Sequence, residues 1–252
     1  MSAAEKVLYV FAHQDDEVMV FVKMALDIRR GREVHALWLT DSAFYEPAEV
    51  REQESRNAMK LLGLTHENLH FLGYPDAQAY KHLENIFRDA SAVAEKLQPV
   101  EITSNAFEGG HIDHDAASLI ASLIAGRLPC CKVHYEFPSY NMYGNRYRVN
   151  EFLPGDDCET LRTPVDDELI GLKLKSLEMY PTQAHVIETL KSIANVEEMM
   201  KSGEPYRVSP AHDYTKRPVE PLVAYEVTFP VPLKFEYFRD AAVELLRKIE
   251  DF

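Results

Sequence analysis

One stretch decides the architecture of this chain: Val7-Leu8-Tyr9-Val10-Phe11-Ala12-His13-Gln14-Asp15-Asp16-Glu17. Its first six residues are apolar without interruption, which is typical of a strand buried on both faces of a parallel sheet. The next five residues place an imidazole and three carboxylates directly after that strand. A buried core has no need for such side chains, so the stretch predicts a parallel strand that leads into a functional loop.

Strand and helix patterns alternate through the first half of the chain. Further strands are expected at residues 34–40, 69–72, 101–105 and 132–137, and helices at 16–30, 46–62, 83–97 and 116–124. Alternation of this kind builds a parallel sheet with helices on both faces. We therefore expect an α/β fold, a Rossmann-like three-layer αβα arrangement with a mostly parallel sheet.

The second half of the chain is less regular. Residues 138–164 and 203–221 show no clear period, and structureless segments of that length are usually functional or contain short strands. Helices at 166–179, 184–200 and 235–249 and a strand at 222–229 are expected between and after them. No repeat or linker interrupts the chain, so residues 1–252 are predicted to form a single domain.

The chain is strongly acidic. Its 41 Asp and Glu residues against 27 Lys and Arg residues give a formal net charge of −14. This charge repels phosphate backbones and anionic lipid, so we expect no nucleic-acid partner and no membrane. The first residues lack a basic and apolar leader, and the three cysteines follow no zinc-finger spacing. A cytoplasmic protein with a small-molecule substrate is the expectation.

A second group of polar residues follows the strand at 101–105: Gly109-Gly110-His111-Ile112-Asp113-His114. In a Rossmann-like strand order the first and fourth strands are neighbours, and ligands bind beyond their carboxyl ends. This topology brings the loops of His13 and His111 side by side despite their separation in sequence. No G-x-G-x-x-G motif follows the first strand, so the crevice is not prepared for a dinucleotide.

The two groups together suit a divalent metal. A catalytic zinc takes three protein ligands and keeps one position open, and His13, Asp16 and one histidine of the second group would supply three. Asp15 and the other histidine would remain as a base and an acid for metal-assisted hydrolysis. Each group alone has a plainer interpretation, because acids after a strand often cap a helix and a lone H-x-D-H is a weak signal. Their meeting at one crevice favours the metal site.

These motifs resemble those of the PIG-L/LmbE-like zinc-dependent de-N-acetylases. The family's A-H-P-D-D-E motif stands at residues 12–17 with Gln14 in place of proline, and its G-H-x-D-H motif stands at residues 110–114. Supporting matches cover most of the chain, at Leu39 to Asp41, Arg51 to Gly63, Leu72 to Asp76 and Lys175 to Gln183.

The resemblance implies a role for each polar residue of the two motifs. His13, Asp16 and His114 would bind Zn²⁺, Asp15 would be the general base, and His111 would be the acid or the oxyanion-stabilising group. Asp113 would orient a histidine, in the first instance His111. Other divalent metals such as Fe²⁺ or Co²⁺ suit the same ligands.

Substrate contacts are expected at Arg51 and Asp76, where family members hold sugar hydroxyls or phosphate, although a surface salt bridge explains these two residues nearly as well. Tyr140 and Tyr143 lie in an aromatic stretch that suits a sugar rim or an ordinary surface. Contact between copies of the chain through this stretch leaves a homo-oligomer open.

The chain departs from some relatives at Gly109, where they carry a tyrosine that assists the oxyanion. The sequence leaves four replacements open: Glu108, Tyr140, Tyr143 and Tyr214.

The sequence therefore predicts a metal-dependent N-deacetylase, a hydrolase acting on an N-acetylated amino sugar, its glycoside or a related small amide. The resemblance implies that metal-bound water attacks the amide carbonyl, with Asp15 as base and His111 as acid or oxyanion stabiliser. Two alternatives stay open. One is a metal-dependent hydratase or lyase on the same scaffold, and the other is a sugar-binding relative without catalysis.

Overall fold

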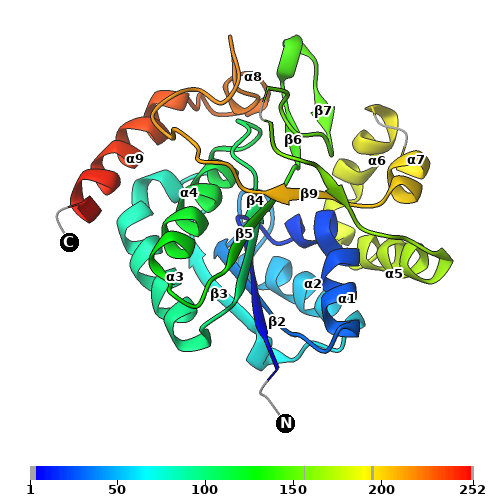
Figure 1. The fold of residues 1–252 in the computed structure, drawn as a ribbon. Coiled ribbons are helices and arrows are strands. Elements are labelled where there is room, and N and C mark those ends of the chain that lie inside the picture. Colours follow the sequence, from blue (N-terminus) through cyan, green and yellow to red (C-terminus); the bar gives the residue numbers. More distant parts are fainter. Residues whose placement is uncertain (1–3, 156, 194–195, 251–252) are drawn as a thin grey trace.

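The computed structural model describes residues 4–155, 157–193 and 196–250 (Figure 1). Its strands are β1 Lys6–Phe11, β2 Glu33–Thr40, β3 Leu69–Tyr74, β4 Glu101–Asn105, β5 Val133–Phe137, β6 Tyr140–Asn141, β7 Arg148–Val149, β8 Leu161–Arg162 and β9 Pro205–Val208. Its α-helices are α1 Phe21–Arg29, α2 Ala48–Leu61, α3 Leu83–Leu97, α4 Ile112–Arg127, α5 Asp167–Leu177, α6 Ala184–Ile193, α7 Val196–Ser202, α8 Tyr225–Thr228 and α9 Phe235–Glu250. Turns of 3₁₀ helix lie at Asp16–Val20, His66–Asn68, Ala79–His82, Tyr143–Asn145 and Pro181–Gln183.

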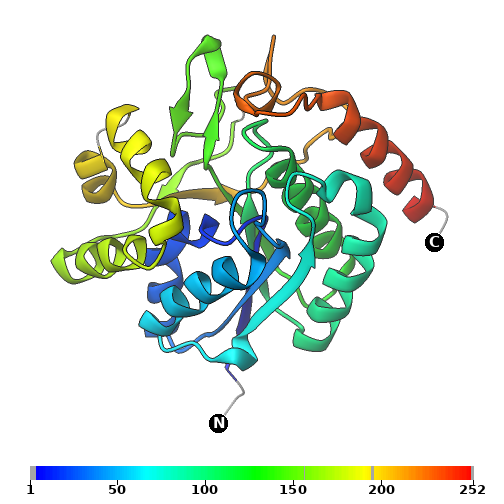
Figure 2. The same cartoon turned by 180° about the vertical axis from the view of Figure 1, so that it is seen from behind.

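The strands form a central sheet between two layers of helices (Figures 1 and 2). Within the described residues this sheet has seven strands, in the order β3-β2-β1-β4-β5-β9-β8. Strands β1 to β5 are parallel, whereas β9 and β8 join antiparallel at one edge. The predicted three-layer α/β fold is confirmed, and so is the neighbourhood of the first and fourth strands, because β1 pairs with β4.

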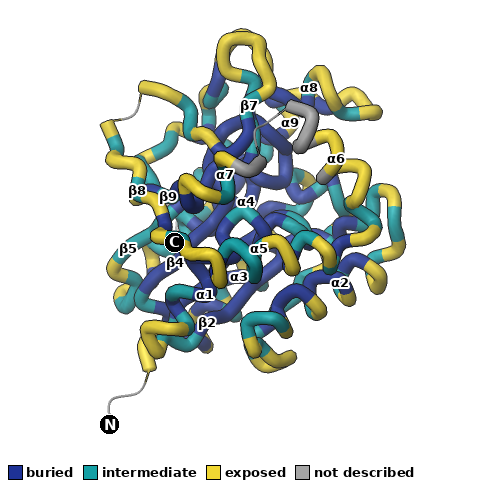
Figure 3. Tube along the Cα trace, turned by 90° about the vertical axis from the view of Figure 1, so that its right-hand side faces the viewer, coloured by how far each residue is buried: buried dark blue, intermediate teal, exposed yellow. Residues whose placement is uncertain are grey.

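Each face of the sheet buries a different set of side chains from the same strand. In β1, Leu8 and Val10 pack in the cluster that includes residues of α3, α4 and α9, whereas Tyr9 and Phe11 pack in the cluster that includes residues of α1 and α2. The burial map shows these inner strands enclosed by more exposed helices and loops (Figure 3). A strand covered on both faces needs apolar side chains on both sides, which explains the unbroken apolar run.

The regular half of the chain folds as expected. The helix predicted at 83–97 is α3 and the strand predicted at 101–105 is β4, both with the same bounds. The helix expected at 16–30 begins instead with a turn of 3₁₀ helix over Asp16–Val20. This tighter turn lies directly after the first motif.

The structure differs most from the sequence-based predictions in the second, less regular half of the chain. The strand predicted at 222–229 is wrong, since Tyr225–Thr228 forms the short helix α8. The Ala224 N–H donates to the carbonyl oxygen of Gly109 at 2.7 Å, and Val223 and Tyr225 are buried. These apolar residues therefore pack against the loop of the second motif and not in the sheet.

The antiparallel edge of the sheet comes from segments in which the sequence shows no period. Strand β9 lies within residues 203–221, and β6, β7 and β8 lie within 138–164. The helix predicted at 184–200 is represented by α6 and α7; residues 194–195 between them lie outside the described residues, as do residues 1–3, 156 and 251–252 of the predicted single domain. No described helix combines the length and the apolarity that crossing a membrane requires.

A buried group of charges ties α1 to the centre of the sheet. The Lys23 ammonium donates to Glu101 at 2.5 Å, Asp27 at 3.2 Å and the Tyr9 hydroxyl at 3.2 Å. Arg32 is the second cation, since its Nη1 lies 2.7 Å from Glu101 and 3.3 Å from Asp27. Charges removed from water at this depth stabilise a fold only while their partners remain.

We predict that Lys23→Met lowers the free energy of unfolding by about 3 kcal/mol. Glu101 would then keep Arg32 as its counter-charge, and Asp27 would keep Arg32 and Arg30, whose side chain is 61% exposed. Denaturant unfolding measures the loss. Lys132→Met is the control at the surface: it makes the same substitution at a lysine side chain that is 71% exposed and paired with Glu5, where such pairs contribute about 1 kcal/mol or less. Equal losses in the two variants would contradict the role of burial.

Candidate metal centre and active site

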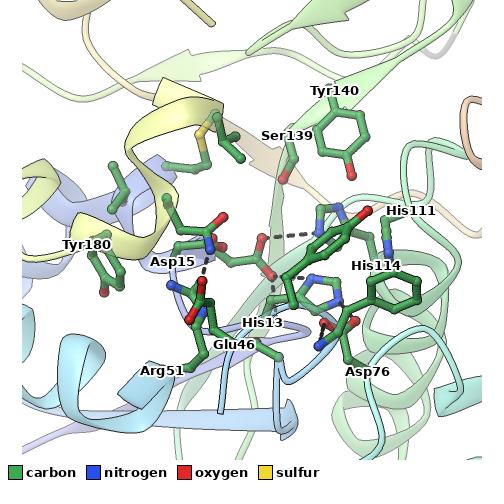
Figure 4. A pocket seen from close by; sticks show the side chains of 18 of the residues that line it. His13, Asp15, Glu46, Arg51, Asp76, His111, His114, Ser139, Tyr140 and Tyr180 are labelled. Atoms are coloured by element: carbon green, nitrogen blue, oxygen red, sulfur yellow. Dashed lines mark hydrogen bonds and ion pairs between the residues drawn. The ribbon is translucent and has the colours of Figure 1, made fainter. Parts of the chain in front are cut away.

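The two motifs meet where β1 and β4 end. The Ala12 N–H donates to the side-chain oxygen of Asn105 at 3.1 Å, which joins the residue after β1 to the last residue of β4. Beyond this bond, the ring centre of His13 lies 4.4 Å from that of His111 and 5.1 Å from that of His114. Figure 4 shows these three rings on one side of a pocket, with Asp15 and Arg51 on the other. The structure thus brings together residues that are about one hundred positions apart.

Gly110 permits the close packing behind the second motif. A Cβ atom at this position would lie 2.0 Å from the carbonyl oxygen of Tyr140, so any side chain would push the β6–β7 hairpin away. Gly109 has a φ of +67°, which favours glycine as well. With both glycines present, the Tyr140 ring packs edge-on to His114 at 5.5 Å between centres.

Three side chains each direct one ligand atom to a common point. A ring nitrogen of His13, a carboxylate oxygen of Asp16 and a ring nitrogen of His114 all lie within 4.8 Å of one another. His114 Nε2 is 3.1 Å from Asp16 Oδ1, and His13 Nδ1 is 3.8 Å from Asp16 Oδ2. Two imidazoles and a carboxylate beside an open cavity are a donor set suited to a catalytic zinc. The residues present therefore fit a divalent cation.

The Nε2 atom of His13, which faces away from Asp16, contacts two further carboxylates. Nε2 lies 3.2 Å from Asp76 Oδ1 and 3.3 Å from Asp113 Oδ2, so Nδ1 is left to face Asp16. Although burial opposes a charged ring, Asp76, Asp113 and Asp16 together raise the pKa of His13 well above its usual value. Carboxylates in this position orient a metal-binding imidazole and make it a stronger ligand. Asp76, expected as a substrate contact, lies where it can also support His13.

The Asp113 carboxylate faces a histidine, as expected, but this histidine is His13 and not His111. This carboxylate accepts the N–H groups of Ala77 at 2.6 Å and Ala79 at 3.0 Å, in addition to facing His13. The reason is the start of α4 at Ile112. The His111 ring caps that helix, with Nδ1 accepting the Asp113 N–H at 3.2 Å, whereas the Asp113 side chain points from the first turn to the 77–79 loop.

Asp15 occupies a backbone conformation that is rarely stable outside glycine, with a φ of +130°. Its N–H donates to Glu17 at 2.9 Å, and Arg51 binds its carboxylate at 2.8 Å and also the carbonyl oxygen of Gln14. Strain of this kind persists where neighbouring groups hold it, and it is frequent at active sites. Burial raises the pKa of Asp15 to about 7 against the opposing charge of Arg51.

Glu17 is a functional residue of the first motif to which the sequence assigned no role. Its buried carboxylate accepts hydrogen bonds from Trp38 Nε1 at 3.0 Å, from Ser55 Oγ at 2.5 Å and from the Tyr180 hydroxyl. These bonds fix the carboxylate that in turn holds the Asp15 backbone. In the sequence, the feature that indicates this network is Glu17 itself, the acidic residue that follows Asp15 and Asp16.

Glu54 and Thr182 hold Arg51 in the same way. Arg51 Nη1 donates to Glu54 at 2.5 Å and to Thr182 Oγ1 at 2.7 Å, and Thr182 donates to Glu54 through both its N–H and its hydroxyl. The resemblance matched the stretches Arg51 to Gly63 and Lys175 to Gln183 without assigning a role to Glu54 or Thr182. Their contact gives that match a physical reason.

A cavity of about 320 Å³ opens in front of these groups, a size found in small-molecule sites. Its lining includes the following residues expected from sequence: His13, Asp15, Asp16, Arg51, Asp76, His111, His114 and Tyr140. Asp113 lies behind His13, and Tyr143 is 42% exposed and does not line the cavity.

Tyr140 is the candidate that reaches the cavity among the four considered for the position of the missing tyrosine. Glu108 is buried below the hairpin, where it accepts the N–H groups of Ser139 at 2.6 Å and Tyr140 at 2.9 Å. Tyr214 lies in the core, with its hydroxyl 3.1 Å from Ser118 Oγ.

His111 presents its second nitrogen to the cavity as a donor. Burial and the neighbouring rings of His13 and His114 lower the pKa of His111 well below its usual value, which favours the neutral ring. Because Nδ1 accepts the Asp113 N–H, the proton of a neutral ring resides on Nε2. The residue can therefore donate a hydrogen bond without being an imidazolium.

An α/β sheet with a His-Asp-His cluster and a further carboxylate at its strand-order switch has the arrangement of metal-dependent hydrolases. Residues 8–125 match the model of the PIG-L family, described as GlcNAc-PI de-N-acetylase. The resemblance found in the two motifs is thereby confirmed, and so is the predicted enzyme class, an N-deacetylase hydrolase.

Solved structures share the fold at low sequence identity. A pseudoaglycone deacetylase of an antimicrobial reagent is 16% identical, with a TM-score of 0.64 over 82% of this chain and 97% of its own. The N,N'-diacetylchitobiose deacetylase from Pyrococcus horikoshii is 19% identical, with a TM-score of 0.60 over 82% and 84%. A 4-carboxy-2-hydroxymuconate hydratase from Pseudomonas putida is 15% identical, with a TM-score of 0.55 over 82% and 96%. The comparison with curated protein sequences gives no match.

We predict that Asp113→Asn weakens zinc binding about tenfold to a hundredfold, because it removes a negative charge beside His13 Nε2. Titration of the metal-free protein with zinc measures the affinity. Asp240→Asn, at a side chain that is 70% exposed, is the control. Unchanged zinc affinity combined with lost turnover would instead indicate that Asp113 acts through His111.

Proposed function

We propose that this protein is a metal-dependent hydrolase that removes the N-acetyl group from an N-acetylated amino sugar, its glycoside or a related small amide. The observation that carries the proposal is the strained Asp15 beside the cluster of His13, Asp16 and His114 at the floor of one cavity. The match of residues 8–125 to a de-N-acetylase family supports the reaction. Zn²⁺ is the proposed ion, with Fe²⁺ or Co²⁺ suited to the same ligands.

A divalent ion bound by these three ligands polarises a carbonyl oxygen and acidifies water. Asp15 is the general base: its carboxylate lines the cavity, and Arg51 fixes it from the opposite side. After taking a proton from the attacking water, Asp15 can return it to the departing amine. Each transfer needs the carboxylate within hydrogen-bond reach of the reacting group. The position of Asp15 in the cavity lining, bound by Arg51, supports this role.

His111 is the donor that stabilises the oxyanion. Its Nε2–H faces the cavity, because Nδ1 is engaged by the Asp113 N–H. A donor fixed before the reaction loses no energy to reorientation when negative charge develops on the carbonyl oxygen. Of the two roles inferred from the sequence, oxyanion stabiliser is the one that this hydrogen-bonding pattern supports.

A hydratase on the same scaffold is the second candidate. It is favoured by the likeness of the fold to that of a hydratase at a TM-score of 0.55. The family match favours deacetylation. Two assays separate the candidates. A deacetylase releases acetate from N-acetylglucosamine derivatives, whereas a hydratase adds water to an unsaturated acid.

The remaining sequence expectations belong to the same proposal. They are a single domain over residues 1–252, a cytoplasmic location, and a small molecule as partner in preference to nucleic acid or membrane. The net charge of −14 is the main support for the choice of partner.

We predict that Asp15→Asn keeps bound zinc but lowers kcat for acetate release at least about a hundredfold, because the amide cannot accept the proton of water. Metal content by elemental analysis and acetate by an enzymatic assay are measured on the same preparation. Near-normal turnover in this variant would mean that another group is the base.

We predict that His114→Ala loses stoichiometric zinc, because only His13 and Asp16 would remain as ligands. His185→Ala, a histidine outside the cavity lining, is the control and should keep its metal. Full zinc occupancy in His114→Ala would remove this residue from the ligand set.

A further inference from the structure

A large part of the cavity lining is apolar, in contrast to the polar cluster that the two motifs form. One wall is formed by Val18 and Met19 after the first motif, Leu177 at the end of α5 and Val186 in α6. These four side chains carry no hydrogen-bonding oxygen or nitrogen. A polyhydroxylated ring placed against them would lose water without gaining hydrogen bonds, which is unfavourable.

Aromatic side chains from other segments continue this apolar lining. Phe44 and Phe229 stack edge to face with 5.0 Å between ring centres, and Phe229 lies 5.1 Å from the ring of His111. Tyr140 and Tyr147 of the hairpin are stacked at 5.3 Å. Aromatic pairs of this kind offer large flat surfaces to an aryl or alkyl group. The apolar lining therefore extends to the ring of His111.

The charges in the cavity argue against an anionic substrate. Four carboxylates line it, from Asp15, Asp16, Glu46 and Asp76, against a single guanidinium, that of Arg51. Arg51 is already bound by Asp15, Glu54 and Thr182. The divalent ion proposed at the floor is the other positive charge of the cavity. With the acetamide carbonyl facing that ion, a phosphate group elsewhere on the substrate would meet the carboxylates and would find the one arginine of the lining occupied.

We propose that the cavity selects an amide whose amine side carries an uncharged aryl or alkyl group, in preference to a free or phosphorylated amino sugar. This inference rests on the proposed N-deacetylation, since an acetyl group is too small to cover the apolar walls. The apolar group would lie against Met19, Leu177 and Val186 while the acetamide reaches the metal ligands. Burial of such a group contributes affinity in proportion to the apolar area removed from water.

The experiment compares kcat/KM of the zinc-loaded protein for three acetamides: 4-nitrophenyl N-acetyl-β-glucosaminide, N-acetylglucosamine and N-acetylglucosamine 1-phosphate. We expect the aryl glycoside to exceed the free sugar by about tenfold or more, and the phosphate to be the poorest substrate. Equal values for the aryl glycoside and the free sugar, or preference for the phosphate, would overturn the proposal.

A matched pair of variants tests the wall itself. Val186→Asp places a carboxylate in the lining at a residue that is 39% exposed, so folding is preserved, and should lower the ratio of aryl to free-sugar kcat/KM about tenfold. Leu174→Asp makes the same change at a residue that is 45% exposed and outside the lining, and should leave the ratio unchanged. A ratio that is the same in both variants would contradict the assignment of the wall.

Calorimetric binding of phenyl β-glucoside and glucose 1-phosphate separates this inference from the proposed reaction, because it requires no turnover. Phenyl glucoside binding that Val186→Asp weakens, in a protein that releases no acetate, would leave the apolar wall standing and refute the deacetylase. Acetate release without tighter binding of the phenyl glucoside would support the deacetylase and refute the apolar wall.

Discussion

The hydrogen bond between the Ala12 N–H and the Asn105 side chain is the contact on which the site depends. It joins β1 to β4 at their carboxyl ends, where the chain leaves the sheet in both cases. His13 and the loop of His111 and His114 follow within a few residues of this junction. The ligand residues therefore lie directly beyond two paired central strands, and elements of this kind position a site more precisely than a long loop does.

Charge explains why this junction suits a cation. Asp15, Asp16, Asp76 and Asp113 gather around His13, and burial or mutual repulsion would ordinarily drive such carboxylates to take up protons. The histidines hold the pKa of Asp16 and Asp76 below its usual value, although burial opposes this. Asp15, held by a single arginine, has its pKa raised to about 7. Asp16 and Asp76 therefore stay ionised near neutral pH, whereas Asp15 can exchange a proton. Hydrolysis needs both kinds of carboxylate, one to bind the cation and one to transfer a proton.

Much of this could be predicted from sequence where local pattern and global fold agree. The apolar run of residues 7–12 must be covered on both faces, and together with the alternation of strands and helices it predicts a parallel sheet. Strand β9 was missed because Pro205–Val208 is a strand of four residues, too short for an alternating pattern to show. Residues 222–229 have β-type composition, yet the hydrogen bond from Ala224 to Gly109 and the burial of Val223 anchor them to the second motif. Tertiary contacts of this kind override local preference and leave no trace in the local sequence.

The contact between Asp113 and His13 shows a second limit of prediction from sequence, and this limit also applies to substrate specificity. Residues two apart in a motif face different directions once a helix starts between them, so Asp113 supports His13 from a distance of 100 positions. The same reasoning applies to the cavity walls. The metal floor comes from motifs with strict spacing, whereas Met19, Leu177, Val186 and Phe229 come from segments whose positions only tertiary packing sets. Relatives with the same floor and different walls can therefore act on different molecules, and the chemistry of the apolar lining, more than the motif, decides which acetamide this protein accepts.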